Sequence, residues 1–127
     1  MTEIVLGFPP NIEEIRDTFE LSGNEIFAWD GTIYSPSKNL PAWLVEHERV
    51  HFEQQDGNPV GWWKKYLSNT QFRIEQEIPA HKEEYRVFCL FEKDKNKHIK
   101  KKVELARRLS SKMYGNMITM KEAMRSL

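Results

Sequence analysis

The stretch His47-Glu48-Arg49-Val50-His51 has the residue types and the spacing of a catalytic metal site. On a helix, residues i and i+4 project from one face, so the imidazoles of His47 and His51 could bind the same ion. Glu48 would then lie beside that ion, where its carboxylate could take a proton from a water molecule. This arrangement is typical of zinc-dependent hydrolysis of peptide bonds. It requires a helix, a third ligand and access for a substrate.

A catalytic zinc ion usually has three protein ligands and one open position, so the chain must supply one more ligand. The candidates downstream of the motif are Glu75, Glu77, His81, Glu83, Glu84 and His98. Glu77, His81 and Glu84 have a spacing of i, i+4, i+7 and would share one face of a helix. Spacing alone ranks Glu77 and His81 about equally. For Glu84 the simpler interpretation is solvent exposure, with an ion pair to a neighbouring basic residue.

The metal motif lies in a predicted helix that covers residues 42–55 and stops at Asp56-Gly57-Asn58-Pro59. Asp30-Gly31 is the strongest hairpin signal in the chain. Periodicity and turn residues predict the other elements: a strand at 4–8, a helix at 11–19, hairpin strands at 26–29 and 32–34, a loop at 36–41, a short aromatic helix at 60–67, and helices at 70–93 and 119–124.

Two features of the C-terminal half affect how these elements end. Pro79 lies inside the predicted helix 70–93 and should either kink that helix or mark a fresh start. Residues 93–102 contain six lysines. We interpret them as a solvated turn between helices rather than a nucleic-acid patch, because aromatic residues are not interleaved with the lysines.

An apolar stripe at helical spacing follows, which we expect to face the core: Ile99, Val103, Ala106, Leu109 and Met113.

The 127 residues, 39% hydrophobic and 30% charged, predict a single domain over residues 1–127. Residues 1–60 hold 3 basic and 11 acidic side chains and residues 61–127 hold 16 and 8, so we expect the halves to neutralise each other. Cys89 is the only cysteine and lies among apolar residues, which predicts a buried thiol. The chain lacks a long apolar run and signal-peptide features, so we expect a cytoplasmic protein without a membrane partner.

Further motifs follow the histidine pair: Gln54-Gln55, Trp62-Trp63-x-x-Tyr66-Leu67, Phe72-Arg73, Gln76-Glu77-x-x-Ala80-His81, Leu105-Ala106-x-x-Leu109-Ser110 and Met113-Tyr114-Gly115-Asn116. With these motifs the chain resembles the small gluzincin-type zinc metallopeptidases called minigluzincins. It is similar in particular to short metallopeptidases that bacteriophages and their bacterial hosts encode. The resemblance covers about residues 26–124. It implies that the protein is located in the cytoplasm of a bacterial or phage-infected cell.

The resemblance implies an α+β, zincin-like fold. In such a fold a small antiparallel sheet or hairpin packs on the HExxH helix, and further helices follow towards the C-terminus. It also implies the third ligand, which in gluzincins is a Glu in an E-x-x-A setting on the following helix. Only residues 77–80 fit that pattern, so we expect Glu77 to bind Zn²⁺ together with His47 and His51.

The sequence departs from the commoner family pattern at two positions close to the expected third ligand. Position 81 is His where the family often has an aromatic residue such as Tyr, so His81 could assist the site or displace Glu77 as a ligand. Pro79 removes the backbone donor that would bond to the carbonyl of Glu75, so it could bend the helix near the ligand.

The expected mechanism uses a zinc-activated water, with Glu48 as the general base, to hydrolyse a peptide or protein substrate. The developing oxyanion needs a further donor, for which His81, Tyr85 and Tyr114 are candidates. By analogy with zincin folds, the strand at 26–29 or 32–34 could pair with an extended peptide.

Two alternatives predict other experimental results. The first is a catalytically silent, zinc-containing binding or assembly module of phage origin, which would hold the metal without turnover. The second is a nucleic-acid-binding module that uses residues 93–112. The sequence disfavours the second, because the acidic half of the chain would repel nucleic acid. Composition and motifs leave the oligomeric state open.

Overall fold

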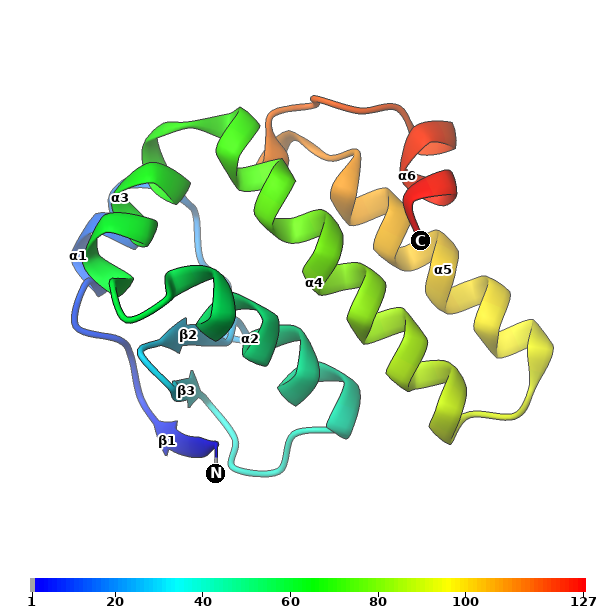
Figure 1. Cartoon of the computed structure of the whole chain (residues 1–127), viewed down its shortest axis with the longest axis horizontal. Coiled ribbons are helices and arrows are strands. Elements are labelled where there is room, and N and C mark those ends of the chain that lie inside the picture. The colour runs from blue at the N-terminus through cyan, green and yellow to red at the C-terminus, as the bar shows by residue number, and fades with distance from the viewer. Residues whose placement is uncertain (1) are drawn as a thin grey trace.

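The computed structural model describes residues 2–127 and contains a small three-stranded sheet beside a group of helices (Figure 1). The strands, in the spatial order β1-β3-β2, are β1 (Glu3–Leu6), β2 (Phe27–Trp29) and β3 (Thr32–Ser35). β2 and β3 form the predicted hairpin, and Asp30 and Gly31 adopt the positive φ angles of its turn, 46° and 86°. β1 pairs parallel with β3, so the sheet is mixed, and the expected antiparallel pairing holds only for the hairpin. A helix between β1 and the hairpin gives the chain the length to return in the same direction.

Helices form much of the remaining chain and place the protein in the predicted α+β class. They are α1 (Ile12–Thr18), α2 (Ala42–Gln55), α3 (Pro59–Ser68), α4 (Thr70–Phe91), α5 (Lys95–Leu109) and α6 (Met120–Ser126), with a 3-10 turn, η1 (Lys112–Tyr114), before α6. In Figure 1, α2 packs against both the sheet and α4, and α4, α5 and α6 pack side by side in that order. The site described below lies where α2 and α4 meet.

The helix α2 has the bounds that the sequence predicts. It follows Pro41 and ends at Asp56, which adopts a left-handed conformation with φ 46° before Gly57. The buried residues of this helix are all polar: Glu48, His51 and Gln55. Because a helix in a globular protein normally buries an apolar stripe, this polar face indicates a site rather than ordinary core packing.

The helix α4 presents a second polar surface to the interior. Asn69 caps it by accepting a hydrogen bond from the backbone N–H of Phe72. The helix is continuous across the exposed Pro79, so Pro79 does not mark a fresh start. Cys89 is half-buried rather than fully buried as predicted. The buried residues of α4 are of mixed type: Arg73, Ile74, Glu77, Ala80, His81, Glu84 and Val87.

The helix α5 begins inside the lysine-rich segment. Asp94 caps it by accepting a hydrogen bond of 2.9 Å from the backbone N–H of Asn96. The prediction that residues 93–102 form a turn is therefore wrong for most of the segment, because lysine is a good helix former and the cap fixes where the helix starts. The apolar stripe faces the core only in its middle, since Ala106 and Leu109 are buried, whereas Ile99 is 61% and Met113 44% exposed.

Two apolar clusters flank the contact between α2 and α4. One contains Ile15, Phe27, Trp62, Trp63 and Tyr66. The other contains Ile74, Ala106, Leu109, Tyr114 and Ala123. The buried guanidinium of Arg73 joins them by donating hydrogen bonds to the backbone carbonyls of Tyr66, Leu67 and Met113. Within residues 2–127, no helix combines the length and the apolar character needed to cross a membrane.

Candidate metal centre

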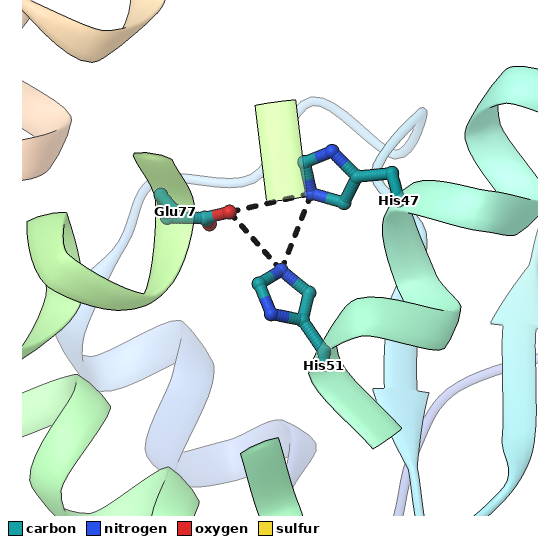
Figure 2. Close-up of side chains that lie close together, drawn as sticks. All are labelled: His47, His51 and Glu77. Atoms are coloured by element: carbon teal, nitrogen blue, oxygen red, sulfur yellow. Dashed lines mark hydrogen bonds and ion pairs between the residues drawn. The ribbon is translucent and has the colours of Figure 1, made fainter. Parts of the chain in front are cut away.

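Two histidines of α2 and one glutamate of α4 bring three potential metal ligands to one point (Figure 2). Nε2 of His51 lies 3.2 Å from Nε2 of His47 and 3.0 Å from Oε1 of Glu77. Nε2 of His47 lies 3.3 Å from the same carboxylate oxygen. The i, i+4 spacing puts both rings on one face of α2, and the packing of α4 brings Glu77 opposite them. Together the three side chains could hold a metal ion.

The spacing of these three atoms fits a zinc ion. A tetrahedral zinc ion with nitrogen and oxygen ligands at roughly 2.0–2.1 Å keeps the ligand atoms roughly 3.3 Å apart. The separations here are 3.0, 3.2 and 3.3 Å. Two imidazoles and a carboxylate are also a common ligand set of catalytic zinc, which leaves a fourth position for water.

The second ring nitrogen of each histidine is bonded to another side chain, which fixes the tautomer. Nδ1–H of His47 donates to Oε1 of Glu84 at 2.9 Å, since a carboxylate can only accept. Nδ1–H of His51 donates to Oε1 of Gln54 at 2.8 Å. The Gln54 amide is held in that orientation because its Nε2 donates to the backbone carbonyl of Gln76 at 2.9 Å. In the neutral form of both rings, the Nε2 lone pairs are therefore directed to the point shared with Glu77.

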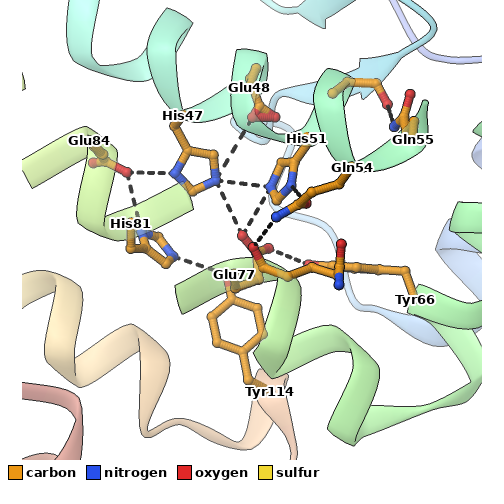
Figure 3. A network of polar contacts seen from close by, with 12 residues as sticks. His47, Glu48, His51, Gln54, Gln55, Tyr66, Glu77, His81, Glu84 and Tyr114 are labelled. Atoms are coloured by element: carbon orange, nitrogen blue, oxygen red, sulfur yellow. Dashed lines mark hydrogen bonds and ion pairs between the residues drawn. The ribbon is translucent and has the colours of Figure 1, made fainter. Parts of the chain in front are cut away.

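The third ligand has an outer partner of the same kind. Oε2 of Glu77 accepts a hydrogen bond from the hydroxyl of Tyr66, at the end of α3, while Oε1 faces the histidines (Figure 3). Partners of this kind orient metal ligands and raise metal affinity. Every side chain of the group thus presents one atom to the shared point and has its other polar atom bonded elsewhere.

The electrostatics of the group favour a cation. Burial alone would lower the pKa of His47, but its hydrogen bonds to Glu77 and Glu84 outweigh burial and raise the pKa to about 10. Burial would raise the pKa of Glu77, yet His51 and His47 hold that pKa well below its ordinary value. The carboxylate is therefore charged, and a metal ion that enters the group must displace protons from the imidazoles.

Glu48 lies next to this group and faces the same cavity. Its side chain is 5% exposed, and its Oε2 lies 3.9 Å from Nε2 of His47. Burial raises the pKa of Glu48, although His47 and His51 oppose the rise. A carboxylate whose pKa is shifted towards neutral pH is suited to take up and release a proton.

His81 lies outside the first group and belongs to a second one with His47 and Glu84. Its Nδ1–H donates to Oε1 of Glu84 at 3.2 Å, and its Nε2 accepts from the hydroxyl of Tyr114 at 3.3 Å. Lys101 of α5 places its ammonium 2.9 Å from Oε2 of Glu84. Because this positive charge disfavours a second cation, we interpret the second group as a hydrogen-bond network behind the first.

The three ligands face a cavity of about 700 Å³, a size typical of sites for small ligands and peptides. Part of its lining is apolar and comes from the N-terminal half of the chain, including Phe19, Leu21 and Trp43. Another part comes from α5 and carries the charged side chains of Lys101 and Arg108. The candidate ligands and Glu48 thus line one cavity of mixed apolar and charged character.

The edge strand β2 is already bonded to the rest of the protein along part of its length. The carbonyl of Ala28 accepts hydrogen bonds from Nε2 of Gln55 at 2.8 Å and from Nε1 of Trp63 at 3.0 Å. β3 is the central strand, so the prediction that residues 32–34 could pair with an extended peptide is wrong. Residues 24–27, before Ala28, also line the cavity, and pairing of a peptide there stays a prediction.

The sequence names Glu84 as a candidate ligand but gives the wrong burial for it. Glu84 is fully buried and bonded to His47, whereas the simpler interpretation placed it in solvent. The shared helical face with Glu77 was the signal that could have found it. Among the other candidates, Glu75 is exposed, and His98 bonds to a backbone carbonyl at the far end of α4.

Comparison with family models, curated proteins and solved structures found no match to this chain. The interpretation of the site therefore depends on its own geometry and chemistry.

Proposed function

We propose that this protein is a zinc-dependent metallopeptidase with a zincin-like fold, in which His47, His51 and Glu77 hold the ion. One observation carries the proposal. The three ligand atoms converge within 3.0–3.3 Å, while the other polar atom of each side chain is bonded to a further side chain. Burying so many ionisable groups costs stability unless they are paired, and a bound cation would add to that pairing.

Glu48 is the general base of the proposed reaction. When bound, zinc supplies a Lewis acid that lowers the pKa of a water molecule towards 7 and polarises the peptide carbonyl. Glu48 takes a proton from that water and later gives it to the leaving amine. Burial raises the pKa of Glu48, which favours the protonated form that the second of these transfers requires.

Tyr114 is the best-placed donor for the developing oxyanion. Its hydroxyl lies 3.3 Å from Nε2 of His81, and both side chains line the cavity. In the resting arrangement the hydroxyl donates to His81, and rotation about its C–O bond would redirect the proton to a substrate oxygen. Tyr85, the other tyrosine considered from the sequence, does not line the cavity.

The test combines metal content with hydrolysis. Purified untagged protein should contain about one zinc per chain by mass spectrometry and should cleave peptides from a mixed library. Glu48→Gln should keep the zinc and lower kcat roughly 10²–10⁴-fold, because it removes only the proton acceptor. The matched control is Glu53→Gln, on an exposed position of the same helix, which should retain activity.

Two results would contradict the proposal. Zinc without cleavage in the wild type, unchanged in Glu48→Gln, would favour the silent binding module over the enzyme. No zinc, even after incubation with the metal, would remove the metal centre itself.

A further inference from the structure

One lysine of α5 enters the interior, whereas Lys97 and Lys100 on the same helix remain in solvent. The side chain of Lys101 is 12% exposed, whereas Lys97 is 62% exposed, and Lys100 is also exposed. The ammonium of Lys101 lies 5.4 Å above the centroid of the Phe88 ring. A lysine is seldom buried without a specific partner, because its charge loses hydration there.

The partner of Lys101 is Glu84. The ammonium forms an ion pair with Oε2 of Glu84 at 2.9 Å, and no hydrogen bond within residues 2–127 reaches that oxygen. The carboxylate is fully buried, and its Oε1 accepts from both His47 and His81. Lys101 thus compensates the one carboxylate oxygen that the histidines leave unpaired (Figure 3 shows the histidine side of this arrangement).

We propose that Lys101 is a positioning residue of the metal centre, which holds the carboxylate of Glu84 in place so that Glu84 orients the imidazole of His47. The inference rests on the zinc centre of the proposed function and does not depend on peptide cleavage. It connects α5, the most basic helix, to a metal ligand on α2 through a single carboxylate of α4.

A competing effect has the opposite sign, which makes the inference testable. Lys101 is also a positive charge near a cation site, and charge repulsion alone would weaken zinc binding. If positioning dominates, removing the ammonium should loosen zinc. If repulsion dominates, the same change should tighten zinc.

The experiment compares Lys101→Met, Lys101→Arg and the exposed control Lys100→Met, each loaded with zinc. Lys101→Met should raise the zinc dissociation constant about tenfold in competition with a chelator, whereas Lys101→Arg and Lys100→Met should stay near the wild-type value. Proton NMR of protein with ¹⁵N-labelled histidine gives a second readout. The Nδ1–H resonances of His47 and His81 should be protected from exchange in wild type and lost to exchange in Lys101→Met.

A second set of variants guards against a change that merely unfolds the protein. Glu84→Gln keeps an acceptor for His47 but removes the charge that needs Lys101. Adding Lys101→Met to Glu84→Gln should therefore change the zinc dissociation constant less than adding it to wild type. Equal effects in the two backgrounds would overturn the inference.

Tighter zinc binding in Lys101→Met, or unchanged affinity with unchanged Nδ1–H resonances, would also overturn it. These results differ from failure of the proposed function. Wild-type protein that binds zinc but cleaves nothing would refute the proposed peptidase activity. The zinc affinities of the Lys101 variants would still test the role of Lys101, because they do not depend on cleavage.

Discussion

Oε1 of Glu84 lies 2.9 Å from Nδ1 of His47, although the two residues are 37 positions apart and belong to different helices. This contact fixes which nitrogen of His47 is free in the neutral ring, because Nδ1 must carry the proton that the carboxylate accepts. The face of α2 that carries both candidate ligands is therefore oriented by α4, which supplies both the third candidate ligand and the residue behind the first.

Glu77 and His81 should differ in their effect on metal content. Glu77→Ala should lose most of the bound zinc, because it removes one of three ligand atoms. His81→Ala should retain about one zinc per chain, because His81 contacts Glu84 and Tyr114 rather than the shared point. Mass spectrometry on both purified variants measures this. Zinc lost in His81→Ala and kept in Glu77→Ala would mean that the ligand set is three histidines.

The Tyr66 hydroxyl should matter for metal affinity. Tyr66→Phe removes the hydrogen bond to Oε2 of Glu77 and keeps the buried ring. We expect a zinc dissociation constant roughly 10–100-fold higher, as for other outer partners of metal ligands. Tyr85→Phe, which alters a tyrosine outside the cavity, is the matched control. Equal affinities of the two variants would show that the Tyr66 hydroxyl does not support Glu77.

The metal-free protein should lose stability as the pH rises. The pKa of His47 is raised from 6.5 to about 10 in the folded state, so the bound proton contributes fully below about pH 6.5. That contribution disappears as the pH rises towards 10, and the free energy of unfolding of the chelator-treated protein should fall over this range. Denaturant titrations at several pH values measure it.

Two controls define what the pH dependence means. Zinc-loaded protein should not show the same fall, because the metal replaces the proton on the histidine. His47→Gln should lack most of the fall, whereas His98→Gln should keep it, because His98 lies outside the site. A fall that persists unchanged in His47→Gln would assign the titration to another group.

Gln55 should contribute to stability and not to metal binding. Its side-chain amide donates to the carbonyl of Ala28 and accepts from the N–H of Asp30, so it ties the hairpin to the end of α2. Gln55→Ala removes both hydrogen bonds and should cost about 2 kcal/mol, at about 1 kcal/mol for each bond. The carbonyl of Ala28 keeps its hydrogen bond from Nε1 of Trp63. The zinc content should not change. Gln71→Ala, at an exposed position of α4, is the matched control. Equal stability of the two variants would show that the Gln55 amide does not hold the hairpin.

The local features of the fold could be predicted from the sequence. Asp30-Gly31 specifies the hairpin turn because both residues adopt the positive φ angles that the turn requires. The helix α2 ends at Asp56-Gly57 because these two residues also adopt positive φ angles. The direction of β1 could not be predicted in this way. Its parallel pairing with β3 depends on the path of the chain through α1, which no residue of β1 encodes.

The residues of the site also differ in whether the sequence can identify them. His47, Glu48 and His51 share one helical turn, so their spacing is enough to identify them. Glu84 and Lys101 were misjudged because their types are those of surface residues, and only the packing of α4 against its neighbours buries them. Polar residues that are buried in pairs carry no pattern that distinguishes them from exposed ones until the fold is known.

Zinc bound at this site would also act as a cross-link. His51 and Glu77 are 26 residues apart, so a shared ion would close a loop that includes all of α3 and join the helices α2 and α4 directly. A single cysteine gives the chain no internal disulfide. The ion would take the role that a disulfide has in small secreted domains, with one difference. This link opens and closes with the supply of metal, so the concentration of free zinc in the cell would set how much of the protein survives proteolysis.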